Sequence, residues 1–168
     1  MEFEKPFDAI IGRYVLQFMP DPAAALRKLV RHLRPRGIVV FHELDWDGAR
    51  SAPPVPTYDR CCRWIAQTLQ HSGAETHMGV RLQSVFVAAE LPPPIMQLRA
   101  VIRAGSGRLE VVHLVTDLVE TLLPAMERLG IATAAQVNLA NLADRIMTES
   151  QSDNAIIGRA EVGAWTRI

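Results

Sequence analysis

Two short apolar runs near the beginning of the chain predict two buried strands. They cover Phe7–Gly12 and Gly37–Phe41, and neither alternates apolar with polar residues as a half-exposed strand does. Between them, Asp21 followed by Pro22 predicts the start of a helix, because aspartate favours the N-cap and proline the first helical position. Apolar residues then recur at helical spacing, at Leu26, Leu29, Val30 and Leu33. The order strand, helix, strand predicts a right-handed parallel βαβ unit whose strands are buried on both faces.

Helical and extended patterns alternate along the rest of the chain. Helical periodicity covers Tyr58–Leu69, Val80–Leu91, Leu109–Met126 and Ala135–Thr148. Pro124 predicts a bend or a break in the third of these helices. Met96–Ile102 alternates apolar and polar residues, and Ala155–Ile168 is apolar and partly β-branched, so both segments predict strands. A proline-rich loop is predicted at Ser51–Pro56.

These patterns predict an α/β fold in which the whole chain, residues 1–168, is one domain; that this domain is partial is implied only by the family resemblance described below. Its expected parts are a βαβ core at 1–50, a helical region at 51–93, and terminal strands at 94–168 that enclose a helical insertion at 109–150.

Charge and cysteine content narrow the class of protein. The 18 basic and 18 acidic residues give a net charge of zero, which provides no electrostatic basis for binding nucleic acid or an anionic membrane. Cys61 and Cys62 are neighbours and cannot form an unstrained disulfide, which favours a reducing compartment. The first residues show no signal-peptide pattern, and no uninterrupted apolar run of about 18 residues exists. We therefore expect a cytoplasmic protein.

Three carboxylates follow the second apolar run, where ligands bind in open α/β sheets. Glu43, Asp45 and Asp47 occupy every second position and so lie on one side of an extended segment. Carboxylates in this arrangement act as a general base, bind Mg²⁺, or form a solvated rim. We expect Glu43 and Asp45 to contact the substrate or remove its proton, and we expect no metal.

Aromatic and histidine side chains are candidates for a substrate pocket. Trp46, Tyr58 and His77, together with Tyr14, are suited to line a pocket for a flat substrate, with ordinary packing as the alternative. The histidines and cysteines lack the spacing of a zinc site. The turn at Gly105–Gly107 lacks the further residues of a phosphate-binding loop.

A family resemblance rests on the order and spacing of several motifs. They are Phe7–Phe18, Leu33–Phe41, Gly79–Leu82, Leu122–Pro124 and Val162–Trp165. In this order they resemble class I S-adenosylmethionine-dependent methyltransferases from their fourth strand onward. The resemblance covers nearly the whole chain and implies the C-terminal half of a Rossmann-like fold. One departure is Arg36, which stands in a turn where the family usually has glycine.

The resemblance implies methyl transfer from S-adenosylmethionine to a small-molecule acceptor. In the family, the loop after the fourth strand contacts the cofactor, which implies this role for Gly12, Arg13, Tyr14 and Gln17. The family's glycine-rich turn and its acidic strand end are absent, so we expect a truncated chain that binds the cofactor poorly by itself. Two alternatives stay open: a non-catalytic remnant that acts as a dimerisation or interaction module, and a different α/β enzyme with a metal at the acidic cluster.

The predicted strand at Phe7–Gly12 indicates that a second copy of the chain is a partner. In the family this strand is central and pairs on both sides, so without its first neighbour it leaves a row of unpaired amides and carbonyls. We expect the chain to self-associate through residues 7–12.

Overall fold

The computed structural model describes residues 5–168, which form two compact units. Unit one consists of residues 5–45, 74–99 and 160–168, and unit two consists of residues 46–73 and 100–159. Two long strands belong partly to each unit. Within the described range, no helix has the length and apolar character needed to cross a bilayer.

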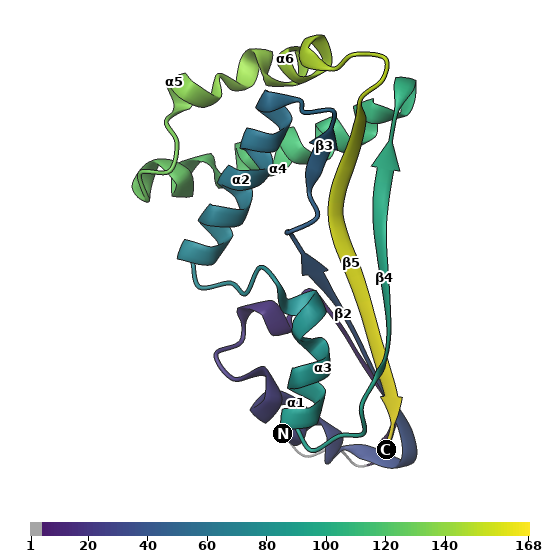
Figure 1. Ribbon diagram of the computed structural model, residues 1–168. Helices are drawn as coiled ribbons and strands as arrows, with labels where there is room; N and C mark the ends of the chain where they lie inside the picture. The colour runs from purple at the N-terminus through teal and green to yellow at the C-terminus, as the bar shows by residue number, and fades with distance from the viewer. Residues whose placement is uncertain (1–4) are drawn as a thin grey trace. The chain divides into compact units, whose positions relative to one another are not determined.

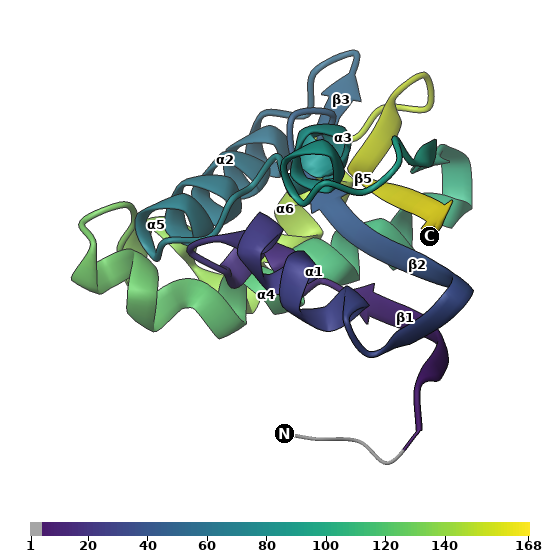
Figure 2. The ribbon, with the colours of Figure 1, turned by 90° about the horizontal axis from the view of Figure 1, so that it is seen from below.

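Figure 1 labels the α-helices and the strands β2 to β5, and Figure 2 labels β1. Unit one contains β1 (Phe7–Arg13), the short 3-10 helix η1 (Leu16–Phe18), α1 (Pro22–Val30), β2 (Leu33–Asp45), α3 (Met78–Ala88) and parts of β4 (Ile95–Arg103) and β5 (Ala155–Arg167). Unit two contains the rest of β4 and β5, with β3 (Arg50–Ala52), α2 (Pro56–His71), η2 (Gly105–Gly107), α4 (Arg108–Arg128), α5 (Ala134–Val137), η3 (Leu139–Asn141) and α6 (Leu142–Glu149).

The βαβ unit forms as the sequence predicts. β1 and β2 pair in parallel, with Ile10 beside Val39, and α1 connects them. Asp21 is the N-cap of α1, and its side chain accepts a hydrogen bond from the amide of Ala24 at 2.8 Å. β5 lies antiparallel on the other side of β2, and the described strands form one sheet in the order β1-β2-β5-β3, with β4 also on β5. The α/β fold class is therefore confirmed.

The core of unit one lies between β2 and the two helices α1 and α3. Its buried members come from η1, α1, β2, α3, the turn after α3, and β5: Leu16, Ala23, Leu26, Leu33, Val39, Phe41, Met78, Leu82, Val85, Phe86, Ala89, Leu91, Val162 and Ala164. The rings of Phe41 and Phe86 meet edge to face, with centroids 6.4 Å apart.

Gly12 leaves room for one of these rings. A Cβ atom at position 12 would lie 2.1 Å from Cε1 of Phe41, far inside van der Waals contact. Phe41 is only 2% exposed and is held against Phe86, so its ring has little room to move. The glycine is therefore a packing residue.

Gly12→Ala is expected to lower the free energy of unfolding by about 1–3 kcal/mol, because it overpacks the core. The double variant Gly12→Ala/Phe41→Leu should lose at least about 0.5 kcal/mol less free energy of unfolding than the sum of the two single losses. Urea unfolding of the four proteins measures this coupling. Gly163→Ala is the control, since no atom lies within 4 Å of a Cβ at that position in β5. Additive effects of the two changes would contradict the steric explanation.

The expected burial of β1 on both faces is wrong. Ile10 packs against the core, but Ile11 on the opposite face is 75% exposed and Phe7 is 42% exposed. The physical reason is that successive side chains of a strand point to opposite faces of the sheet, and the core packs only against the face of Ile10. An apolar run without alternation does not show whether one face of the strand or both faces are covered.

β2 is longer than the apolar run that predicts it. It begins at Leu33 and ends at Asp45, so His42 to Asp45 belong to the strand and not to the loop after it. Arg36 has a φ of 66°, in the left-handed region that favours glycine. The position that was expected to be a turn thus lies within β2, and its backbone conformation favours glycine.

Unit two is built mainly from helices that contact one another, namely α2, α4 and α6. α4 continues through Pro124 without a break. The predicted helix Ala135–Thr148 is wrong, because Asn138 adopts a left-handed conformation (φ 48°) and divides the segment into α5, η3 and α6. Asparagine tolerates this conformation, which commonly ends helices. The loop predicted at Ser51–Pro56 contains the short strand β3, which pairs with the beginning of β5.

Both cysteines are unpaired thiols buried in α2, as expected. Burial raises the pKa of Cys61 to about 11 and that of Cys62 to about 12. At neutral pH both are therefore protonated packing residues and poor nucleophiles.

Candidate functional site

Glu43 fixes the loop that follows β1. Its side chain is fully buried, and Oε1 accepts hydrogen bonds from the amides of Val15 at 3.0 Å and Leu16 at 2.8 Å. Tyr14, the first residue of this loop, has a positive φ of 54°. Gln17 is almost buried, and its amide nitrogen donates to the Tyr14 carbonyl at 3.4 Å. Tyr14 and Gln17, for which the resemblance implies contact with the cofactor, therefore lie in a loop with a defined conformation.

A polar cluster surrounds the Tyr14 side chain. The Tyr14 hydroxyl donates to Oε1 of Glu161 at 2.7 Å, and the Arg13 guanidinium lies 4.6 Å from the centre of the tyrosine ring. Nε2 of His42 is 3.4 Å from Oε2 of Glu161. Glu161 was not among the predicted site residues, although it stands as a charge between the apolar positions of β5.

A cavity of about 340 Å³ opens beside this cluster in unit one. It is lined by His42, Gln97, Arg99, Glu161, Gly163 and Trp165. Its lining combines the indole ring of Trp165, the guanidinium of Arg99, the imidazole of His42 and the carboxylate of Glu161.

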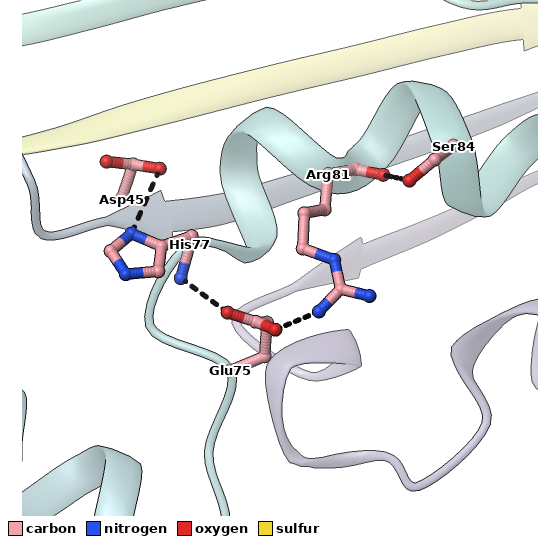
Figure 3. Close-up of polar contacts among 5 residues, drawn as sticks. All are labelled: Asp45, Glu75, His77, Arg81 and Ser84. Carbon is pink, nitrogen blue, oxygen red and sulfur yellow. Dashed lines mark hydrogen bonds and ion pairs between the residues drawn. The ribbon is translucent and has the colours of Figure 1, made fainter.

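Asp45 and His77 come together at the carboxyl end of β2. Asp45 ends the strand with a side chain that is 6% exposed, and His77 is the N-cap residue of α3 with a side chain that is 37% exposed. Nδ1 of His77 is 3.9 Å from Oδ2 of Asp45 (Figure 3). This distance exceeds a direct hydrogen bond but suits an ion pair when the imidazole carries a second proton.

Glu75 holds His77 in place. Its Oε1 accepts from the backbone amide of His77 at 3.0 Å, and Oε2 forms an ion pair with Arg81 (Figure 3). Burial alone would raise the pKa of Glu75, but these two partners lower it on balance. The Glu75 amide also donates to the Gln17 carbonyl at 2.8 Å, which joins the loop after β1 to the start of α3.

Arg81 lies in the first turns of α3, and its backbone carbonyl accepts a hydrogen bond from the Ser84 hydroxyl at 2.8 Å (Figure 3). Neither Glu75 nor Arg81 was among the site residues predicted from the sequence. Their six-residue separation crosses the start of a helix and matches no local motif.

Two predicted pocket residues belong to unit two. Tyr58 is fully buried, and its hydroxyl donates to the Ile157 carbonyl at 3.0 Å. Burial also raises the pKa of Tyr58. Trp46 is 6% exposed, with the Arg159 guanidinium 5.8 Å from the centre of its ring. These contacts favour the packing interpretation for Tyr58, and the substrate-binding role of both residues stays a prediction.

Residues 2–83 match the model of a family described as a methyltransferase domain. This range contains β1 to most of α3, and with them the loop held by Glu43 and the pair formed by Asp45 and His77. The class I methyltransferase resemblance is confirmed. No curated protein matches the chain.

Solved structures resemble the chain at low sequence identity, and the first of those named here has a TM-score above 0.5. A candidate methyltransferase from Bacillus halodurans C-125 has a TM-score of 0.53 at 11% identity, over 99% of this chain and 67% of that one. Phosphoethanolamine N-methyltransferase 2 from Haemonchus contortus gives a TM-score of 0.44 at 16% identity, over 98% of this chain and 35% of that one. A candidate sarcosine dimethylglycine methyltransferase from Galdieria sulphuraria gives 0.40 at 14%, over 97% and 53%. The chain thus spans between about a third and two thirds of the length of these proteins.

Proposed function

We propose that this chain takes part in methyl transfer from S-adenosylmethionine to a small-molecule acceptor. The observation that carries the proposal is the methyltransferase-domain match of residues 2–83, which contains both strand ends where the candidate residues lie. In open α/β sheets, ligands bind at the carboxyl ends of the strands.

The loop after β1 fits one side of the cofactor. S-adenosylmethionine supplies an electrophilic methyl group bound to a sulfonium. A loop that meets it mainly through backbone groups needs a single fixed conformation, and the hydrogen bonds from Val15 and Leu16 to Glu43 provide one. Arg13, Tyr14 and Gln17 are the residues proposed to contact it. Because Gly12 packs against the ring of Phe41, we propose that it contacts the cofactor only through its backbone.

Asp45 and His77 are proposed to handle the proton of the acceptor. The imidazole of His77 is the more exposed of the two groups and accepts the proton that an O–H or N–H acceptor loses as its lone pair forms the new bond. The carboxylate of Asp45 stabilises the resulting imidazolium across the 3.9 Å that separates them. Glu43, with one oxygen engaged by two amides and no exposed surface, is proposed to position the loop.

Formation of S-adenosylhomocysteine by the full chain tests the proposal. We expect the product in mass spectra after incubation with S-adenosylmethionine and a panel of phenols, amines and carboxylates, with a rate that depends on one class of acceptor. Calorimetric titration with S-adenosylhomocysteine reports cofactor binding separately. Absence of both binding and product would overturn the proposal, whereas binding without turnover would support the cofactor site and reject the catalytic role.

A further inference from the structure

The cavity beside the Tyr14 cluster lies on the face of the sheet that is turned away from the core of unit one. In β5, Val162 and Ala164 are core residues, so Gly163 between them points to the opposite face. In β2, Phe41 is a core residue, and the next side chain, that of His42, points to the opposite face for the same reason. His42 lies beside Gly163 in the antiparallel register. The paired strands β2 and β5 therefore form the floor of the cavity.

Gly163 leaves this floor open. A Cβ atom at position 163 would have no atom within 4 Å. Two residues to either side, on the same face of β5, stand the carboxylate of Glu161 and the indole of Trp165. β4 pairs with β5 (Figure 1) and adds Gln97 and Arg99 to the lining. A flat, open position beside an indole suits a planar ring, because aromatic rings attract one another in offset-stacked and edge-to-face arrangements.

The charge that stays uncompensated in this lining is positive. Oε1 of Glu161 accepts from the Tyr14 hydroxyl at 2.7 Å, and the Arg13 guanidinium donates to the same hydroxyl at 2.9 Å. Nε2 of His42 lies 3.4 Å from the other oxygen of Glu161. Arg99, in contrast, is exposed and forms no ion pair with a carboxylate of residues 5–168. A guanidinium presents a planar set of donors that matches the two oxygens of a carboxylate.

We propose that this cavity binds an aromatic carboxylate of one or two rings. The ring lies over Gly163 beside the indole of Trp165, and the carboxylate accepts hydrogen bonds from the guanidinium of Arg99, with the Gln97 amide as a further donor. The cavity volume of about 340 Å³ falls within the range of small-molecule pockets, which is about 300–1,000 Å³.

This site is distinct from the one proposed for methyl transfer. Asp45 follows Phe41 by four residues and so belongs to the core-facing side of β2, whereas His42 points to the opposite face. The aromatic carboxylate is therefore not the acceptor whose proton His77 takes up. Its binding is measured without S-adenosylmethionine, so the failure of either proposal leaves the other unaffected.

NMR titration of the full chain with 2-naphthoate tests the proposal. The indole N–H signal of Trp165, identified by its absence in Trp165→Phe, is expected to shift and to saturate. The uncharged 2-naphthamide should bind about 10-fold more weakly or less, because it lacks the charge-assisted hydrogen bonds to Arg99. The cationic 2-naphthylmethylamine should bind more weakly still. Absence of a saturable shift with 2-naphthoate, or binding of the amide or the amine at least as tight, would overturn the proposal.

Two variants assign the binding to this cavity. Gly163→Val fills the floor and is expected to raise the dissociation constant of 2-naphthoate by about 30-fold or more. The strand should tolerate the change, because the Cβ has no close neighbour, and circular dichroism checks that the fold is kept. Arg99→Gln should raise the same constant by about 10-fold and leave that of 2-naphthamide unchanged.

Arg63→Gln is the matched control for the loss of charge, because Arg63 is an exposed arginine of α2 in unit two, and it should leave the binding of 2-naphthoate unchanged. Wild-type affinity in Gly163→Val or in Arg99→Gln would place the ligand elsewhere on the molecule and overturn the proposal.

Discussion

His77→Gln is expected to lower kcat/KM for methyl transfer by about 10²–10⁴-fold, the usual loss when a general base is removed. Glutamine keeps the backbone amide that donates to Glu75 but cannot take up a proton. The start of α3 should therefore stay in place while the proton acceptor is lost. The initial rate of S-adenosylhomocysteine formation, measured with the best acceptor, reports the effect.

Two further variants separate a chemical role of His77 from a structural one. His113→Gln removes an exposed histidine of α4 and should leave the rate unchanged. Asp45→Asn should also slow the reaction, by a smaller factor than His77→Gln, because the imidazolium loses its carboxylate but the base is retained. A His77→Gln protein with the wild-type rate would exclude this residue as the base.

The sequence predicted those elements whose signals are local. The start of α1 could be foreseen from Asp21 and Pro22 alone, because capping is decided within one turn of helix. The end of α5 at Asn138 could not be foreseen in this way. The residues around Asn138 fit a continuous helical pattern, and the helix ends there because Asn138 adopts a left-handed conformation. The exposure of Ile11 likewise depends on what packs against its face of the sheet, which the local sequence does not specify.

The site was predictable only in part, for the same reason. Asp45 could be placed at a strand end because the strand before it is an apolar run. His77 was found as an isolated candidate, but its proximity to Asp45 depends on α3 packing against β2. Glu75 carried no signal at all, since its partners are a backbone amide two residues on, a carbonyl of the loop after β1, and Arg81.

Glu43→Ala is expected to lower the free energy of unfolding by about 2–5 kcal/mol. The change leaves a cavity at a fully buried position and removes the acceptor of two amides, those of Val15 and Leu16. A buried amide without an acceptor costs about 1–3 kcal/mol, because water cannot replace the lost partner. Urea unfolding followed by circular dichroism measures the loss.

Glu43→Gln isolates the contribution of the negative charge. Its side-chain carbonyl can still accept from both amides and fills nearly the same volume, so we expect a loss of about 1 kcal/mol. Glu120→Ala is the surface control, because Glu120 is exposed on α4, and its effect should stay within about 0.5 kcal/mol. A small effect of Glu43→Ala, similar to that of the control, would mean that the loop after β1 holds its shape without this carboxylate. Other contacts would then have to hold residues Arg13 to Gln17 in the conformation that we propose for cofactor binding.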